Sequence, residues 1–221
     1  MVASTGPTEP LSIRIASTSG AVRVIAEDRA DVSVQGRAEQ RHDDRHVTVE
    51  GGSSRLTVRV PLGSDVVVGA ESGGVGVVGP LGHVSAVSRS GRVIVSDVTS
   101  ADIRAESGRV EVDGCRGECV VRGDSGKVEI TECGTADIVT RSGRITVSGV
   151  RGDVRAHCVS GRVEVDLDEA ADVDAETVSG RIVVRYPRGV TPRRTDEDDA
   201  VGGDCVLHAR AVSGRVTVGN R

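Results

Sequence analysis

Branched apolar residues alternate with polar residues along most of the chain, and a recurring Ser-Gly pair interrupts the alternation. The glycines of these pairs lie at 73, 91, 108, 126, 143, 161, 180 and 214, so the successive intervals are 18, 17, 18, 17, 18, 19 and 34 residues. A fixed period of this size is typical of a solenoid, in which each unit buries its apolar face against its neighbours. The last interval is close to two periods and predicts an irregular insertion.

Each unit contains two strand-like segments that flank the Ser-Gly pair. After the pair, apolar residues occupy the second and fourth positions beyond the glycine, as in Val93 and Val95. Before the pair, apolar or small residues occupy alternate positions. Alternation of β-branched residues predicts half-buried strands and leaves no helical stripe. A residue seven positions beyond most of the glycines is expected to fill a corner: Pro80, Val98, Cys115, Cys133, Val150 and Pro187.

The position two residues before each serine is small, which predicts an interior that narrows toward the Ser-Gly turn. Its occupants are Ser88, Ala105, Gly123, Thr140, Cys158, Thr177 and Ala211. Glycine adopts a positive φ without steric cost and serine can hydrogen-bond to nearby backbone, so the pair suits the turn. The pattern therefore predicts an all-β fold, a single-stranded parallel β-solenoid (β-helix) with about 17–18 residues per coil.

One solenoid domain is expected over residues 11–221, after a disordered N-terminus at residues 1–10. Its first part, residues 11–54, predicts an irregular N-terminal cap that contains a hairpin with Gly51 to Ser54 as its turn. A cap here would cover an open sheet edge. The remainder is expected to comprise regular coils at 55–186, a polar loop insertion at 187–204 and a last coil at 205–221.

Composition restricts the core and the function. With no Phe, no Trp and one Tyr, the core must be built from Val, Ile, Leu, Ala and Cys. Acidic residues exceed basic residues by 33 to 28, and the net charge of −5 disfavours nucleic-acid binding. The N-terminus does not resemble a secretory signal, and no apolar run is long enough to span a membrane. We therefore expect a cytoplasmic protein without direct membrane insertion, and peripheral association with the cell envelope stays open.

A basic residue follows the glycine in most units, and coils stacked about 4.8 Å apart would align these residues in one column. This basic column is the first candidate interaction surface: Arg92, Arg109, Lys127, Arg144, Arg162, Arg181 and Arg215. Because like charges repel, Glu111, Glu129 and Glu164 are expected to neutralise part of it. The second candidate is the loop insertion, with the contact residues Arg193, Arg194, Asp196, Glu197, Asp198 and Asp199.

Groups that could carry out chemistry are sparse. The five cysteines form no CxxC pair, so buried thiols are favoured over a zinc site. A disulfide between Cys115 and Cys133 is geometrically conceivable but is disfavoured without a secretory signal. The five histidines are scattered, and the repeat carboxylates alternate with the basic column. We therefore expect no catalytic residue, no metal site and no cofactor.

The stretch from Leu56 to Val95, with the Ser-Gly-basic-apolar units that follow it, resembles a bacterial β-strand-repeat family of unknown function that carries the adhesin name. The resemblance extends over roughly Leu11 to Val218 and implies a β-solenoid without catalytic residues. This chain places Arg or Lys where the family usually has an acidic or neutral residue, so its surface chemistry is expected to be its own.

These patterns favour a non-catalytic scaffold or adhesin-like interaction protein that presents charged ladders to an unknown protein or cell-envelope partner. A polysaccharide-binding or polysaccharide-cleaving β-helix is an alternative, and it requires a groove that gathers carboxylates without intervening arginines. A self-assembling filament subunit, formed by end-to-end or edge pairing of strands, is a further alternative.

Overall fold

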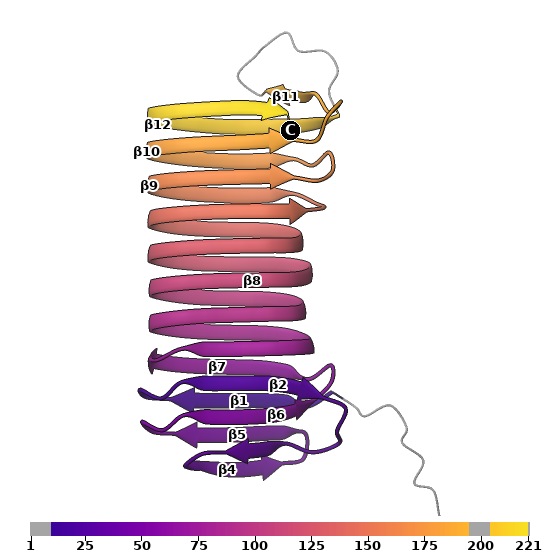
Figure 1. Ribbon diagram of the computed structural model, residues 1–221, viewed down its shortest axis with the longest axis vertical. Helices are drawn as coiled ribbons and strands as arrows, with labels where there is room; N and C mark the ends of the chain where they lie inside the picture. The colour runs from indigo at the N-terminus through magenta and orange to yellow at the C-terminus, as the bar shows by residue number, and fades with distance from the viewer. Residues whose placement is uncertain (1–9, 195–203, 221) are drawn as a thin grey trace, which may run out of the picture.

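The computed structural model describes residues 10–194 and 204–220, and within them it contains strands and no helix. The strands are β1 (Ser12–Ser17), β2 (Val22–Glu27), β3 (Ser33–Gln35), β4 (Ala38–Asp43), β5 (His46–Gly51), β6 (Leu56–Pro61), β7 (Asp65–Ser72), β8 (Val75–Val150), β9 (Val154–Leu167), β10 (Val173–Tyr186), β11 (Pro192–Arg194) and β12 (Cys205–Asn220). Together they form one sheet that winds into a tall stack (Figure 1). The all-β, mostly parallel fold expected from the repeat is confirmed.

Parallel pairing keeps equivalent repeat positions in register from one coil to the next. Ser142 pairs with Ser160, and Ser160 pairs with Ser179. The same register continues from β10 to β12, where Ser179 meets Ser213. Every repeat position in this part of the sheet therefore becomes a column of side chains along the stack.

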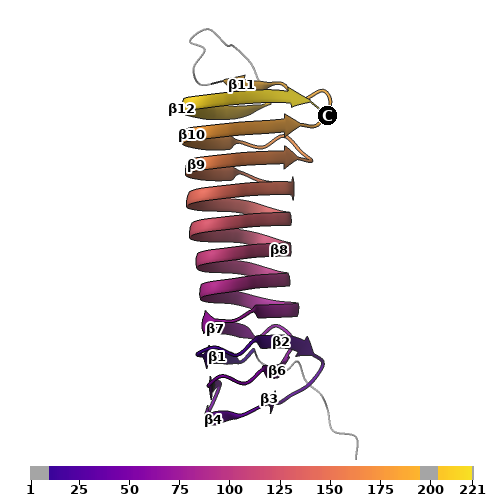
Figure 2. The same ribbon diagram turned by 60° about the vertical axis from the view of Figure 1, so that its left-hand side comes forward.

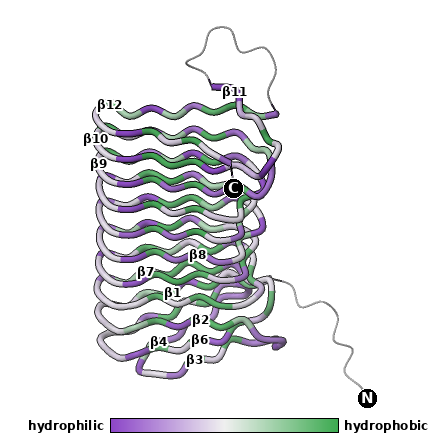
Figure 3. The backbone as a smooth tube through the Cα atoms, turned by 45° about the horizontal axis from the view of Figure 1, so that its top comes forward, coloured by the Kyte–Doolittle hydropathy of each residue, from purple (hydrophilic) through white to green (hydrophobic). Residues whose placement is uncertain are grey.

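The core is a thin layer of small aliphatic side chains inside the coils. Ile145, Val147, Val163 and Val165 have no exposed surface. Hydrophobic and hydrophilic residues alternate along each coil in Figure 3, as strands with one buried face require. Because each coil contributes few large side chains, the fold depends on contact with the coils on either side.

The corner opposite the Ser-Gly turn is filled almost as expected, with two corrections. Val98, Cys115, Cys133 and Val150 are buried there. Pro80 is exposed and Pro187 is half-buried, and their neighbours Leu81 and Tyr186 are buried instead. The buried corner residue does not always lie seven positions after the glycine, because the coils differ in the number of residues before the corner. Val150, for example, pairs with Leu167 across a shift in register. The buried residues at these positions are Leu81, Leu167 and Tyr186.

Glycine is required at the Ser-Gly turn for two reasons. The φ angles of Gly108, Gly126 and Gly143 are +129°, +133° and +130°, a region that residues with a side chain rarely adopt. In addition, a Cβ on any of the three would lie 1.9 Å from the carbonyl oxygen of the glycine one coil earlier. At this turn, the backbone of one glycine therefore packs directly against the backbone of the glycine in the preceding coil.

The N-terminal strands differ from the expected cap. β1 pairs in parallel with both β5 and β7, and β2 pairs in parallel with both β6 and β8. The coil formed by β1 and β2 therefore lies inside the stack, between two coils that follow it in the sequence (Figures 1 and 2). Of the described strands, β3 and β4 lie at this end, where they pair antiparallel with β6 and β5.

The hairpin predicted around Gly51 to Ser54 is wrong. β5 and β6 do not pair with each other; they are the two arms of one coil. Their connection serves as a Ser-Gly-type corner, because a Cβ on Gly20 in the next coil would lie 1.9 Å from the Ser54 oxygen. The hairpin instead joins β4 to β5, and Asp44 in its turn has a φ of +45°.

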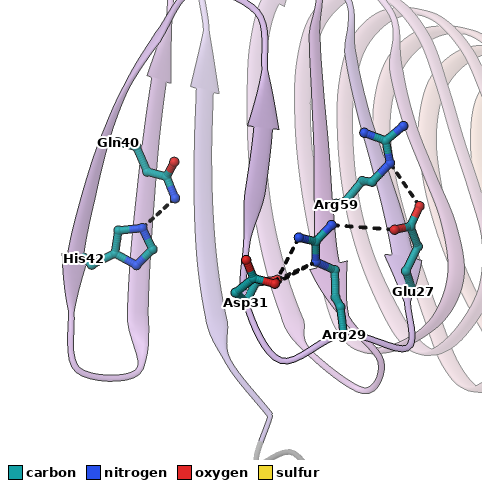
Figure 4. Close-up of polar contacts among 6 residues, drawn as sticks. All are labelled: Glu27, Arg29, Asp31, Gln40, His42 and Arg59. Atoms are coloured by element: carbon teal, nitrogen blue, oxygen red, sulfur yellow. Dashed lines mark hydrogen bonds and ion pairs between the residues drawn. The ribbon is translucent and has the colours of Figure 1, made fainter.

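Ion pairs hold the segment that follows β2 against the end of the stack (Figure 4). Arg59 in β6 lies 3.0 Å from Glu27, and Arg29 lies 3.6 Å from the same carboxylate. Arg29 also contacts Asp31 at 2.9 Å. These charges cover the place where the chain leaves the inner coil to form β3 and β4.

At the other end, β12 follows β10 in the stack, and β11 covers only the start of β12. Pro192 pairs with Cys205 and Arg194 pairs with Leu207. Part of the expected loop insertion is therefore a short strand. The expected disordered stretch at residues 1–10 and the middle of the insertion lie largely outside the described residues.

Candidate functional site

The structure aligns the basic column that the repeat predicts, and ion pairs neutralise one half of it. Arg109 lies 2.6 Å from Glu111 and also contacts Glu129. Lys127 contacts Glu129 as well, and Arg92 reaches Glu111 at 3.7 Å. The hydrogen bonds from Lys127 and Arg109 hold the pKa of the Glu129 carboxyl below its usual value.

The other half of the basic column carries more unbalanced charge. Arg162 pairs with Glu164 at 3.3 Å. Arg144, Arg181 and Arg215 are exposed, and the structure gives them no ion pair with a described carboxylate. Thr146 and Val183 occupy the positions that Glu111 and Glu129 fill in earlier coils, which explains the difference.

The second predicted surface is only partly described. Arg193 and Arg194 lie in β11, in register with Val206 and Leu207 of β12. The predicted contact residues Asp196, Glu197, Asp198 and Asp199 lie outside the described residues. The described part of this segment is thus an edge strand, and it brings two arginines to the end of the stack.

A groove that the sequence did not predict runs along the face formed by the second strand of each coil. Its volume is about 820 Å³, and its lining extends from β5 through β1 and β7 into β8. The floor consists of the narrow repeat position that precedes each Ser-Gly turn: Gly51, Ser17, Ala70, Ser88, Ala105 and Gly123. Their side chains are small, and those of Ser17, Ala70, Ser88 and Ala105 are buried.

The residues on either side of each floor position form the walls of the groove. One wall position is a glycine, Gly69, and no heavy atom lies within 4 Å of the place where its Cβ would be. Val87 and Val139 are apolar wall residues and are 46% and 43% exposed. The remaining wall residues are mostly charged: Glu50, Glu71, Arg89, Arg104, Glu106, Arg122 and Asp124.

The wall charges are arranged unevenly along the groove. Arg89 and Glu106 lie 3.7 Å apart in its middle and balance each other. Glu50 and Glu71 lie toward the β5 end, and no ion pair links either of them to a described basic residue. Arg122 lies toward the opposite end, likewise without an ion pair to a described carboxylate. The groove therefore has an acidic end, and an opposite end at which Arg122 lacks a described acidic partner while the neighbouring Asp124 pairs with Arg141.

Further along the same face, His157, Asp174, Glu176 and His208 form a cluster. Glu176 lies between the two histidines, 3.2 Å from Nδ1 of His157 and 3.2 Å from Nε2 of His208. The hydrogen bond from His208 is the main reason that the pKa of Glu176 lies below its usual value. Beside the cluster is a hollow of about 370 Å³, whose lining includes the exposed valines Val159, Val178 and Val212.

The five cysteines are free and buried, as the favoured interpretation expected. The disulfide considered between Cys115 and Cys133 is not formed. Burial raises the pKa of the Cys133 thiol to about 12. The neighbouring Cys119 lowers the pKa of the Cys115 thiol, and Cys115 together with burial raises the pKa of Cys119. The Cys115 thiol also lies 3.5 Å from the carbonyl oxygen of Glu118.

Most of the chain matches a known protein family. A family model described as Toastrack DUF4097 matches residues 46–218, which is most of the chain. The chain belongs to the Toastrack DUF4097 family. No curated protein and no solved structure matches the chain.

Membership in the Toastrack family supports the predicted resemblance at the level of an uncharacterised β-rich family, and it assigns no adhesin activity. The matched segment begins at His46 in β5, so the coil formed by β1 and β2 lies outside the matched Toastrack residues. Among the described residues, no helix has the length and hydropathy to span a membrane.

Proposed function

We propose that this Toastrack protein is a non-catalytic binding scaffold whose axial groove receives an extended polypeptide segment of a protein or cell-envelope partner. The groove of about 820 Å³ along the second-strand face carries the proposal. Its six floor positions span five coil spacings, or about 24 Å, which is the length of roughly seven extended residues. An extended segment laid along the stack would fit this shape.

Charge and surface composition support a peptide over a sugar. Glu50 and Glu71 at one end favour a basic residue of the partner, and Arg122 at the other end favours an acidic one. The described groove lining contains no aromatic ring, which disfavours stacking with sugars. Arg89, Arg104 and Arg122 also line the groove, whereas the alternative of a polysaccharide-cleaving β-helix calls for carboxylates without intervening arginines.

The test uses two glycines that both have open space where a side chain would lie. Gly69 is in the groove wall, and Gly76 lies in β8 outside the groove lining. Gly69→Trp would fill the groove, whereas Gly76→Trp adds the same bulk elsewhere. Peptides of about 12 residues, longer than the roughly seven that the groove accommodates, are selected from a random library on the wild-type protein.

The selected peptides are expected to bind Gly76→Trp as they bind the wild type, and to bind Gly69→Trp at least about tenfold more weakly. Reversing the charge of the acidic end with Glu71→Lys should weaken those peptides whose basic residue determines binding. If no peptide is selected, or if Gly69→Trp and Gly76→Trp bind the selected peptides equally, the groove is not a peptide site. Circular dichroism of both variants confirms that the strand content is kept.

A further inference from the structure

Four side chains that can coordinate metals meet on the outside of the last coils, beyond the Val139 end of the groove. His157 lies in β9, Asp174 and Glu176 lie in β10, and His208 lies in β12. The parallel register sets Asp174 opposite His208 and Glu176 opposite His157. Stacking of coils thus brings together residues that are far apart in the sequence.

The ligand atoms are already near the spacing that a metal ion requires. One ligand atom each from Asp174, Glu176 and His208 lie within 4.8 Å of one another. Nε2 of His208 lies 3.2 Å from Oε1 of Glu176. Two ligands that are each about 2.1 Å from a tetrahedral zinc ion lie about 3.4 Å apart, so small side-chain movements would bring all three atoms onto one ion.

A second observation concerns Asp174. Its Oδ1 atom is shielded from solvent and accepts no hydrogen bond from the described residues. Its other oxygen lies 3.9 Å from Nε2 of His157. A shielded carboxylate oxygen without a partner is unfavourable, and a cation bound beside it would remove that cost.

We propose that Asp174, Glu176 and His208 bind a divalent transition-metal ion, with Zn²⁺ as the favoured ion, and that His157 positions Glu176. An imidazole nitrogen with two carboxylates suits Zn²⁺, whereas Mg²⁺ and Ca²⁺ prefer oxygen ligands alone. Nδ1 of His157 lies 3.2 Å from Oε2 of Glu176, where it can donate a hydrogen bond and leave Oε1 for the metal. The side chains are 36% to 44% exposed, so an ion can enter from solvent.

The experiment is calorimetric titration of Zn²⁺ into the metal-stripped, reduced full-length protein, with Mg²⁺ titrated in parallel. We expect one Zn²⁺ per chain with a Kd below about 10 µM. Glu176→Gln and His208→Ala should each weaken binding by about 100-fold, and His157→Ala by about tenfold, because it acts through Glu176. The control His83→Ala, which changes a histidine in a different coil, should bind as the wild type does.

A second measurement separates this site from the buried thiols. Co²⁺ bound by nitrogen and oxygen ligands should lack the strong near-ultraviolet band of thiolate coordination. Zinc binding that Glu176→Gln and His208→Ala leave unchanged, a thiolate band with Co²⁺, or no saturable binding would each overturn the proposal. Equal affinity for Mg²⁺ would also overturn it. Melting temperatures of the metal-free variants identify any that have lost the fold, and Glu176→Gln is nearly isosteric with the wild type.

Discussion

Gly143 lies directly over Gly126, so close that a Cβ on Gly143 would be 1.9 Å from the carbonyl oxygen of Gly126. The same distance recurs between most neighbouring Ser-Gly turns, for example where Gly161 meets Gly143 and where Gly180 meets Gly161. The separation between coils is therefore set at this corner by the backbone itself.

Gly143→Ala is expected to lower the free energy of unfolding by at least about 3 kcal/mol, since it combines a backbone clash with an unfavourable φ. Gly76→Ala is the matched control, because nothing lies within 4 Å of its Cβ position. We expect that control to stay within about 1 kcal/mol of the wild type. Urea unfolding followed by circular dichroism measures both, and equal stabilities would refute the role given to the turn.

Glu132→Gly should stabilise the protein, although it removes a side chain. Glu132 has a φ of +54°, and Gly114 and Gly149 have similar values of +74° and +67° at the equivalent position, just before a buried corner residue. Relief of the left-handed conformation is worth about 1 kcal/mol. The reverse change, Gly149→Ala, should destabilise by a similar amount, and thermal unfolding of the pair tests whether the two effects have opposite signs.

Tyr186 should not ionise in the folded protein at a pH where a free phenol does. Burial raises its pKa above the usual value of 10.0, and it is the only tyrosine of a chain without tryptophan. Its neutral form therefore stabilises the fold below about pH 10, and this stability is lost as the pH rises further. Absorbance at the tyrosinate wavelength should rise only together with loss of the β-sheet circular dichroism signal, and an earlier rise would contradict the burial of the ring.

The thiols should be unreactive until the protein unfolds. All five are buried, and Cys133, with a pKa of about 12, has almost no thiolate at pH 8. A thiol reagent should therefore label none of the cysteines rapidly in buffer and all five in denaturant. Fewer than five labelled thiols in denaturant without reductant would indicate a disulfide.

The repeat positions could be predicted because a period of 17 or 18 residues determines which side chains stack. The Ser-Gly turn and the alternating Val and Ile followed directly from that period. The order of the coils did not, because alternating strands of similar pattern can pair with one another interchangeably. Nothing in the β1 sequence indicates that it lies between β5 and β7.

The candidate sites were missed for related reasons. The groove depends on the inner coil, because Ser17 of β1 supplies one of its floor residues. The metal-ligand cluster had a detectable signal, since His157 and Glu176 occupy the same repeat position in successive coils. His208 follows only after the insertion at 187–204, so the period of the repeat alone does not place it beside Glu176.

The placement of the β1–β2 coil has a consequence for synthesis of the chain. β1 and β2 leave the ribosome before the strands on either side of them, and one of those neighbours, β8, begins only at Val75. The nascent solenoid therefore cannot add its coils in the order of the sequence. The coil formed by β1 and β2 can complete its pairing only after the coils on both sides of it have been synthesised. Each later coil can then pair with the folded coil before it.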